Sequence, residues 1–153
     1  NFIEPNKKII EKNVGSNLFS DITKDRLSPF LGLQFERFCE DSLMKILEKL
    51  GLELREVKNF GPFFQQQTKS GEGVQFDMVL ELRNGNLHIL EFKYHQKPIG
   101  LGVVQQMKEK IQKMHFDPDR TIEKTLISAS GFSKELIAEK YFDHLLTLSD
   151  FYK

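Results

Sequence analysis

The sequence has a single cysteine, Cys39, among its 153 residues. One thiol cannot form an internal disulfide or a multi-cysteine zinc site, and this usage is typical of a reducing compartment. Neither charge is in excess, because 22 Lys and Arg balance 22 Asp and Glu. No overall positive field therefore indicates nucleic acid or a membrane surface. No apolar run approaches the roughly 18 to 20 residues that cross a bilayer. We expect a cytoplasmic protein without a membrane segment, in which any binding to nucleic acid depends on a local patch.

The composition that remains is that of one globular domain. Hydrophobic residues make up 39% and charged residues 29% of the chain, which excludes a disordered or collagen-like protein. Residues 1–27 hold no sustained hydrophobic period, so we expect a linker or the tail of an upstream domain there, followed by a domain over 28–153. The chain starts with Asn1 instead of an initiator methionine, and we expect it to be cut from a longer protein. Its oligomeric state is open.

Hydrophobic periodicity and turn signals predict a defined order of helices and strands. Ser28-Pro29 has the form of a helix start and Gly51 that of a helix stop, which predicts one long amphipathic helix between them. The later elements are strands over 52–67, 74–83 and 87–94, a helix over 101–115, a strand over 121–130, a helix over 134–142 and a strand over 145–148. This αβββαβ order with an added helix and strand predicts an α/β fold, in which helices flank a mixed sheet.

The turn at 84–86 divides two strands of alternating pattern and forms a hairpin. A two-residue loop would place apolar side chains of the first strand opposite charged ones of the second. A three-residue loop over 84–86 pairs apolar with apolar side chains, so burial favours it. In this register Asp77 lies opposite Lys93, and Glu91 lies one pair along on the same face. The sequence thus predicts two carboxylates and an amine at one end of the sheet.

Two neighbouring acids need a neutralising partner, because burial and mutual repulsion both disfavour their charges. Carboxylate oxygens are suited to Mg²⁺ or Mn²⁺, and magnesium prefers one or two protein carboxylates together with waters and a substrate phosphate. Lys93 beside them can orient or deprotonate a water and stabilise charge on phosphorus. The plain alternative is an ion pair at a strand edge.

The pattern of Asp77, thirteen residues and then Glu91-Phe92-Lys93 resembles the metal-binding signature of the PD-(D/E)XK phosphodiesterase superfamily, which includes restriction enzymes and junction resolvases. The proline that often precedes the aspartate is Phe76 here. The resemblance implies a restriction-endonuclease-like core and a nuclease activity that depends on Mg²⁺ or Mn²⁺.

The resemblance also implies further site residues. In related members a glutamate on the first helix joins the metal ligands, and Glu36 in the segment Gly-Leu-Gln-Phe-Glu-Arg-Phe-Cys matches that position. A glutamine in the helix after the E-x-K strand often assists, which indicates Gln105 or Gln106. The implied catalytic set is Asp77, Glu91, Lys93, Glu36 and Gln105, and the implied metal ligands are Asp77, Glu91 and Glu36.

A second resemblance covers nearly the whole chain. The opening residues 1–8, the block 30–36, the hairpin and the corner at 130–133 are similar to the C-terminal domain of archaeal-type AAA ATPases, including bacterial members. This implies an upstream ATPase domain of the same protein as a partner. The chain has no G-x-x-x-x-G-K-[ST] motif, so nucleotide hydrolysis is not expected of this piece.

Local charge favours a nucleic-acid partner over the middle of the chain. Residues 58–113 hold eight Lys and Arg against five Asp and Glu. Lys97 and Lys108 are placed to follow a phosphate backbone, and His95 is either a phosphate contact or a surface loop residue. The hypothesis is a metal-dependent phosphodiesterase acting on DNA. The alternative is a catalytically inactive module of the same fold that binds nucleic acid or protein.

Overall fold

The computed structural model describes residues 18–66, 73–114, 117 and 119–152. Residues 1–17, most of the expected linker, lie outside these ranges. Within the described residues no helix is long and apolar enough to cross a membrane.

A mixed sheet of five strands forms the centre of the structure, in the order β1-β2-β3-β4-β5. The strands are β1 Val57–Gln65, β2 Val74–Leu82, β3 Leu87–Lys93, β4 Ile122–Ser128 and β5 His144–Thr147. The first three are antiparallel neighbours, whereas β4 and β5 continue parallel to β3. The parallel step from β3 to β4 passes through a helix, as such crossovers do.

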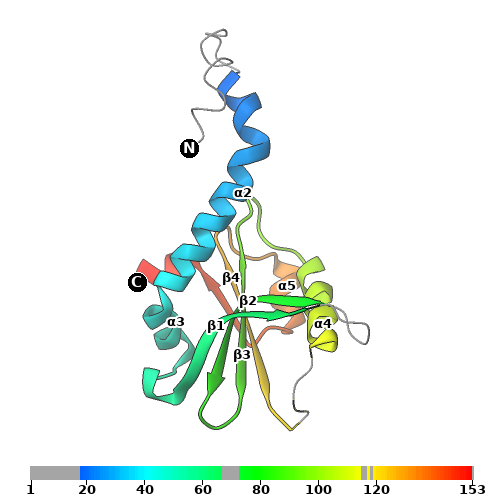
Figure 1. The fold of residues 1–153 in the computed structure, drawn as a ribbon. Helices are drawn as coiled ribbons and strands as arrows, with labels where there is room; N and C mark the ends of the chain where they lie inside the picture. Colours follow the sequence, from blue (N-terminus) through cyan, green and yellow to red (C-terminus); the bar gives the residue numbers. More distant parts are fainter. Residues whose placement is uncertain (1–17, 67–72, 115–116, 118, 153) are drawn as a thin grey trace.

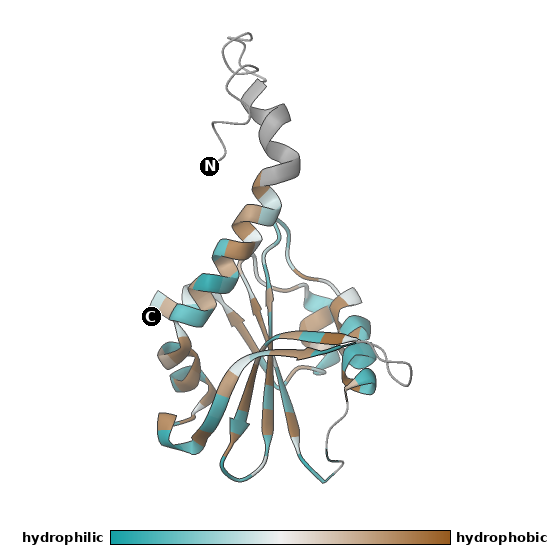
Figure 2. Cartoon of the chain, viewed as in Figure 1, coloured by the Kyte–Doolittle hydropathy of each residue, from teal (hydrophilic) through white to brown (hydrophobic). Residues whose placement is uncertain are grey.

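Helices cover both faces of this sheet (Figure 1). They are α2 Leu18–Asp41, α3 Leu43–Leu50, α4 Gly102–Lys113 and α5 Lys134–Glu139, with short 3₁₀ segments η1 Leu54–Glu56 and η2 Leu148–Tyr152. One apolar core lies between the sheet and α2 with α3, and a second lies on the side of α4 and α5. The hydrophobic residues of β3 and β4 run between the two (Figure 2). The predicted α/β class, with a mixed sheet flanked by helices, is confirmed.

The first helix was predicted with the wrong start and without the break inside it. It begins at Leu18, so Pro29 lies inside α2 and the last ten residues of the expected linker are helical. A proline inside a helix removes one N–H donor, and here the helix continues through it. The helix also breaks at Ser42, whose N–H contacts the carbonyls of both Phe38 and Cys39, at 3.0 and 3.1 Å. The expected single helix is therefore two, α2 and α3. The predicted stop at Gly51 is correct, with φ +70°.

The hairpin register differs from the prediction by two residues. Leu80 pairs with His88, and Leu82 donates its N–H to the carbonyl of Asn86 at 2.9 Å. The turn is therefore 83–85, with Gly85 at φ +91°, a conformation that glycine adopts without strain. A shift of two residues leaves every side chain on its original face. Burial therefore cannot separate the two registers, and the turn decides.

A bulge in β2 lies at Asp77. Gly61 of β1 pairs with Val79, but Phe63 pairs with Phe76, so two residues of β2 oppose Pro62 alone. Proline has no N–H for the ladder, and bulges often stand where the ladder is interrupted. The regular pairing of β2 with β3 ends at Met78, and Asp77 is thus free to aim its carboxylate at the backbone of β3.

A buried histidine lies at the far end of β3 from this bulge. His88 is 2% exposed, and its Nε2 lies 3.2 Å from the carboxylate of Glu123, which His144 also approaches at 3.5 Å. Nδ1 of His88 has no hydrogen-bond partner among the described residues. Burial lowers the pKa of His88, opposed by Glu123 and assisted by His144.

This burial predicts an acid-dependent loss of stability. A histidine whose folded-state pKa is lowered binds its proton more readily when unfolded, so its contribution is complete above the unfolded pKa of about 6.5 and declines as the pH falls. His88→Gln has no such proton, so we expect the parent to lose more stability than this variant between pH 7 and pH 5. Urea unfolding at pH 7 and pH 5 measures the loss of stability in each protein. Equal losses in the parent and in His88→Gln would contradict the prediction.

Candidate active site

Asp77 and Glu91 lie one residue beyond the last regular pair of β2 and β3, Met78 with Leu90. Their carboxylates are thus neighbours across the strands, where the predicted register had Asp77 opposite Lys93. The backbone N–H of Phe92 donates to Oδ2 of Asp77 at 2.7 Å, which fixes one oxygen of that carboxylate. The shared face expected from the sequence is unchanged because the register shift is even.

The Glu91 carboxylate is buried between two lysines. Its side chain is 3% exposed, and Nζ of Lys93 lies 3.1 Å from Oε2, while Lys110 pairs with Oε1. The ammonium of Lys110 also lies 5.5 Å from the centre of the Phe76 ring. Each oxygen of the buried acid thus has its own cation, which offsets the cost of removing the charge from water.

Asp77 is less well compensated. Burial and then the charge of Glu91 raise its pKa to about 6, while the Phe92 N–H, Lys93 and Lys110 act in the opposite direction. Repulsion between the two carboxylates therefore persists although two lysines are close. A divalent cation between them would remove it.

A cleft of about 420 Å³ opens beside this pair. Its lining comes from the start of β2, from β3 and from one face of α4: Gly73, Val74, Gln75, Asp77, Glu91, Lys93, Gln106, Glu109, Lys110 and Lys113. The carboxylates supply hard oxygen ligands, and two such groups suffice for a magnesium ion that keeps several waters. Among the described residues no group of three or more His, Cys, Asp or Glu is placed to hold a metal. The residues therefore fit Mg²⁺ or Mn²⁺ and do not fit an all-protein cage.

Glu36 does not line this cleft. It is half-buried on α2, and its charge and that of Asp77 both act on the Cys39 thiol, whose pKa burial and these acids raise to about 12. Cys39 is fully buried, so it is an inert core thiol. Glu36 and Asp77 are thus both near Cys39, and among the described residues Glu36 does not complete a three-acid metal cluster.

Of the two glutamines on α4, Gln106 lines the cleft. Gln105 instead donates to Glu109 at 2.8 Å. One residue along a helix turns the side chain by about 100°, whereas positions i, i+4 and i+7 share a face. Gln106 therefore lies on the same face as Lys110 and Lys113, which favours Gln106 over Gln105 as the candidate assisting residue.

The two lysines expected to follow a phosphate backbone lie apart. Nζ of Lys108 is 5.2 Å from the centre of the Tyr141 ring, toward α5, and Lys108 does not line the cleft. Lys97 lies in a second cleft together with His95. Only Lys97 is therefore beside the site.

Lys110 is the residue that the sequence reasoning missed. In the sequence it is one of the eight basic residues of 58–113, with nothing in its immediate neighbours to single it out. The available signal was its position three residues after Met107 and four before Met114, both buried. That spacing places Lys110 on the face of α4 that packs on the sheet.

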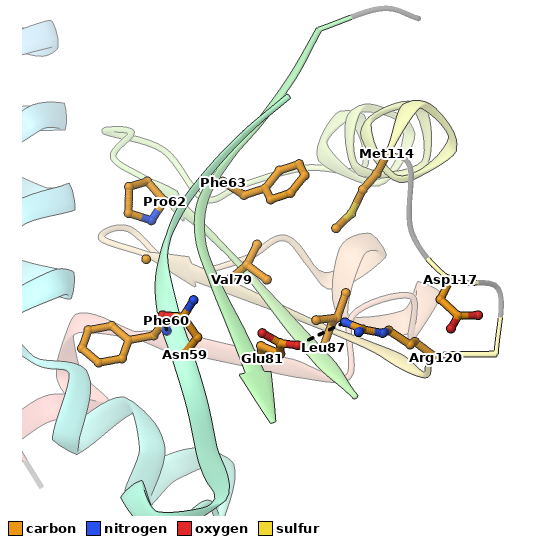
Figure 3. A pocket seen from close by; sticks show the side chains of 11 residues that line it. Asn59, Phe60, Pro62, Phe63, Val79, Glu81, Leu87, Met114, Asp117 and Arg120 are labelled. Carbon is orange, nitrogen blue, oxygen red and sulfur yellow. Dashed lines mark hydrogen bonds and ion pairs between the residues drawn. The ribbon is translucent and has the colours of Figure 1, made fainter. Parts of the chain in front are cut away.

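A further cleft of about 450 Å³ lies on the sheet near the end of α4. Figure 3 shows Phe63, Val79 and Met114 along it, with an ion pair between Glu81 and Arg120 at its edge. It contains neither Asp77 nor Glu91, and its apolar walls have no counterpart in the predicted chemistry.

Comparison with protein families gives a match over residues 1–115 to DUF234, described as archaea bacterial proteins of unknown function. The chain belongs to this family. No curated protein matches it.

Three solved structures are similar, each 18% identical in sequence. A repair endonuclease from Pyrococcus abyssi is matched over 71% of this chain and 45% of its own, with a TM-score of 0.43. A protein of unknown function, AF1548, is matched over 69% and 53%, with a TM-score of 0.46. An EndoMS–dsDNA complex is matched over 71% and 44%, with a TM-score of 0.39. This chain thus spans about half the length of these structures, and the functional argument rests on its own site.

Proposed function

We propose that this domain is a metal-dependent phosphodiesterase of the PD-(D/E)XK type that acts on DNA. The observation that carries the proposal is the pair of neighbouring carboxylates, Asp77 and Glu91, with two lysines in one open cleft. Nothing in the packing of a strand edge requires a buried acid beside a second, less well compensated one, because such an arrangement costs stability.

Asp77 and Glu91 would hold Mg²⁺ or Mn²⁺ through their oxygens. When bound, such an ion polarises a phosphoryl oxygen and lowers the pKa of a coordinated water. Lys93, on the same strand face as Glu91, is placed to stabilise negative charge that develops on the phosphate. Gln106 supplies an amide donor at the cleft wall, and Glu36 on α2 would be an accessory residue.

The wider context belongs to the same proposal. The similarity of the sequence to the C-terminal domains of archaeal-type AAA ATPases supports an upstream ATPase domain as a partner, acting in the cytoplasm.

One observation favours the alternative of an inactive module. Both oxygens of Glu91 already pair with lysines, and a closed carboxylate–lysine cluster of this kind can stabilise a fold without binding an ion. Metal binding therefore separates the two functions.

The test is the melting temperature with and without millimolar Mn²⁺, beside cleavage assays on plasmid, single-stranded DNA and RNA. We expect Mn²⁺ to raise the melting temperature and to support cleavage of DNA. Glu109→Gln is the matched control, because it removes a carboxylate from the same cleft that pairs with Gln105 instead of a lysine. It should keep the Mn²⁺ shift of the parent. If Mn²⁺ does not raise the melting temperature of the parent, the inactive module replaces the enzyme as the proposed function.

A further inference from the structure

A second cleft adjoins the Asp77–Glu91 cleft where α4 begins. It has a volume of about 500 Å³ and lies between the segment that follows β3 and the first turns of α4. Lys93 and Gln106 line both clefts. A ligand that extends out of the first cleft past these two side chains therefore enters the second.

The second cleft is positively charged. Ten residues line it: Lys93, His95, Gln96, Lys97, Pro98, Ile99, Gly100, Gly102, Val103 and Gln106. None of them is acidic, whereas the first cleft contains Asp77, Glu91 and Glu109. The lysine ammonium groups and the glutamine amides are the donors that phosphate oxygens accept from. The first cleft also contains Lys93, Lys110 and Lys113, so it carries both signs of charge, whereas the second cleft has basic groups alone and suits an anion.

The walls of the second cleft are held in place by backbone hydrogen bonds. Ile99 donates to the carbonyl of Gly131 at 2.9 Å and accepts from the N–H of Ser133 at 2.9 Å. The hydroxyl of Ser130 donates to the carbonyl of Lys97 at 2.7 Å. The corner at 130–133 therefore fixes the segment that carries Lys97, and a binding site with a fixed frame loses less entropy when it is filled.

We propose that this second cleft binds a phosphate group of the nucleic acid strand, next to the phosphate that is held at Asp77 and Glu91. The inference rests on the proposed function for the direction of the strand, while the charge and frame of the cleft are independent of it. The phosphate is either an internal phosphodiester or a terminal monophosphate, which share the same oxygen chemistry. Lys97 and Gln106 are the binding residues, and Lys93 faces both phosphates.

Gly102 offers a sharp test. It lines the cleft, a Cβ added there meets no atom within 4 Å, and its φ lies outside the left-handed region. Asp and Asn at this position therefore fit equally well and differ only in charge. An acid in the first turn does not oppose helix formation, so Gly102→Asp is expected to fold.

The assay is anisotropy of a labelled single-stranded oligonucleotide without divalent metal, over a series of salt concentrations. We expect Gly102→Asp to weaken binding at least tenfold and Gly102→Asn at most threefold. Lys97→Gln should make the slope of the logarithm of the binding constant against the logarithm of the salt concentration shallower, by the amount that corresponds to about one phosphate contact. Oligonucleotides with and without a 5′-phosphate separate the sources: a terminal site prefers the phosphorylated one, and an internal site treats both alike.

The outcomes for the two proposals differ. Equal binding by the Asp and Asn variants, or no salt-dependent binding by the parent, overturns the phosphate site. The Mn²⁺ shift of the melting temperature reports on Asp77 and Glu91 separately, and it should be the same in Gly102→Asp and in the parent. If the parent binds the oligonucleotide more tightly than Gly102→Asp and yet shows no Mn²⁺ shift, that result would support the phosphate site and contradict the nuclease proposal.

Discussion

Asp77→Asn should stabilise the metal-free protein, and Glu91→Gln should destabilise it. The two residues are neighbours of similar chemistry, but they have different surroundings. Asp77 has a pKa raised to about 6 from 3.8, mainly by burial and by Glu91, so its charge is unfavourable in the folded state at neutral pH. The difference corresponds to at most about 3 kcal/mol, and we expect a gain of about 1 to 2 kcal/mol from the neutral amide. The amide oxygen still accepts the Phe92 N–H.

Glu91 behaves in the opposite way because its charge has partners. Removing it leaves Lys93 and Lys110 without their carboxylate in a partly buried place. Breaking a buried pair by removing one partner costs about 3 to 5 kcal/mol. Since the two ammonium groups are about a quarter to a third exposed, we expect a smaller loss of about 1 to 3 kcal/mol. Urea unfolding at pH 7 without metal measures both variants, and effects of the same sign would contradict this account.

The gain from Asp77→Asn should depend on pH. The folded-state pKa lies above the unfolded one, so the folded parent binds the proton first as the pH falls from about 7 to 4. Protonation removes the penalty in the parent, and the advantage of the variant should shrink over this interval and vanish near pH 4. With millimolar Mn²⁺ both variants lack a metal ligand, so both should lose the metal shift and the cleavage that depends on it.

The strands and their faces were predictable because alternation of apolar and polar residues directly reports burial. Asp77, Glu91 and Lys93 could be assigned to one face on that basis alone. The exact partner of Asp77 was not predictable in this way. A slip of two residues conserves every face, and the turn that contains Gly85 at positive φ decides the register.

The long helix shows a different limit. Ser28-Pro29 has the local form of a helix start, but α2 passes through it, although a proline inside a helix removes one N–H donor and crowds the preceding turn. Lys110 shows a third limit of prediction from the sequence. Lysine is read as a surface residue by default, and only the buried acid on β3 gives it an inward partner. That contact joins residues 19 positions apart, which helix periodicity alone does not reveal.

Lys93→Met and Lys110→Met should be strongly non-additive. Each lysine pairs with one oxygen of the same buried carboxylate, so either can neutralise Glu91 when the other is gone. We expect each single variant to lose about 0.5 to 1 kcal/mol, the scale of a partly exposed ion pair. The double variant leaves a buried carboxylate without a cation, which costs about 3 kcal/mol or more. The loss in the double variant should therefore exceed the sum of the single losses by at least about 1 kcal/mol.

The same pair of substitutions in a Glu91→Gln background is the control, because the charge that couples the lysines is then absent. There the two losses should be small and additive.

The lysines should also differ in function. Lys93→Met should keep the Mn²⁺ shift and lose about a hundredfold or more in cleavage rate, the scale of a charge-stabilising group. Lys110→Met should increase the Mn²⁺ shift, since its ammonium competes with the ion for an oxygen of Glu91, and it should lower the rate less than tenfold. Additive losses in the parent background would mean that the two lysines do not share Glu91.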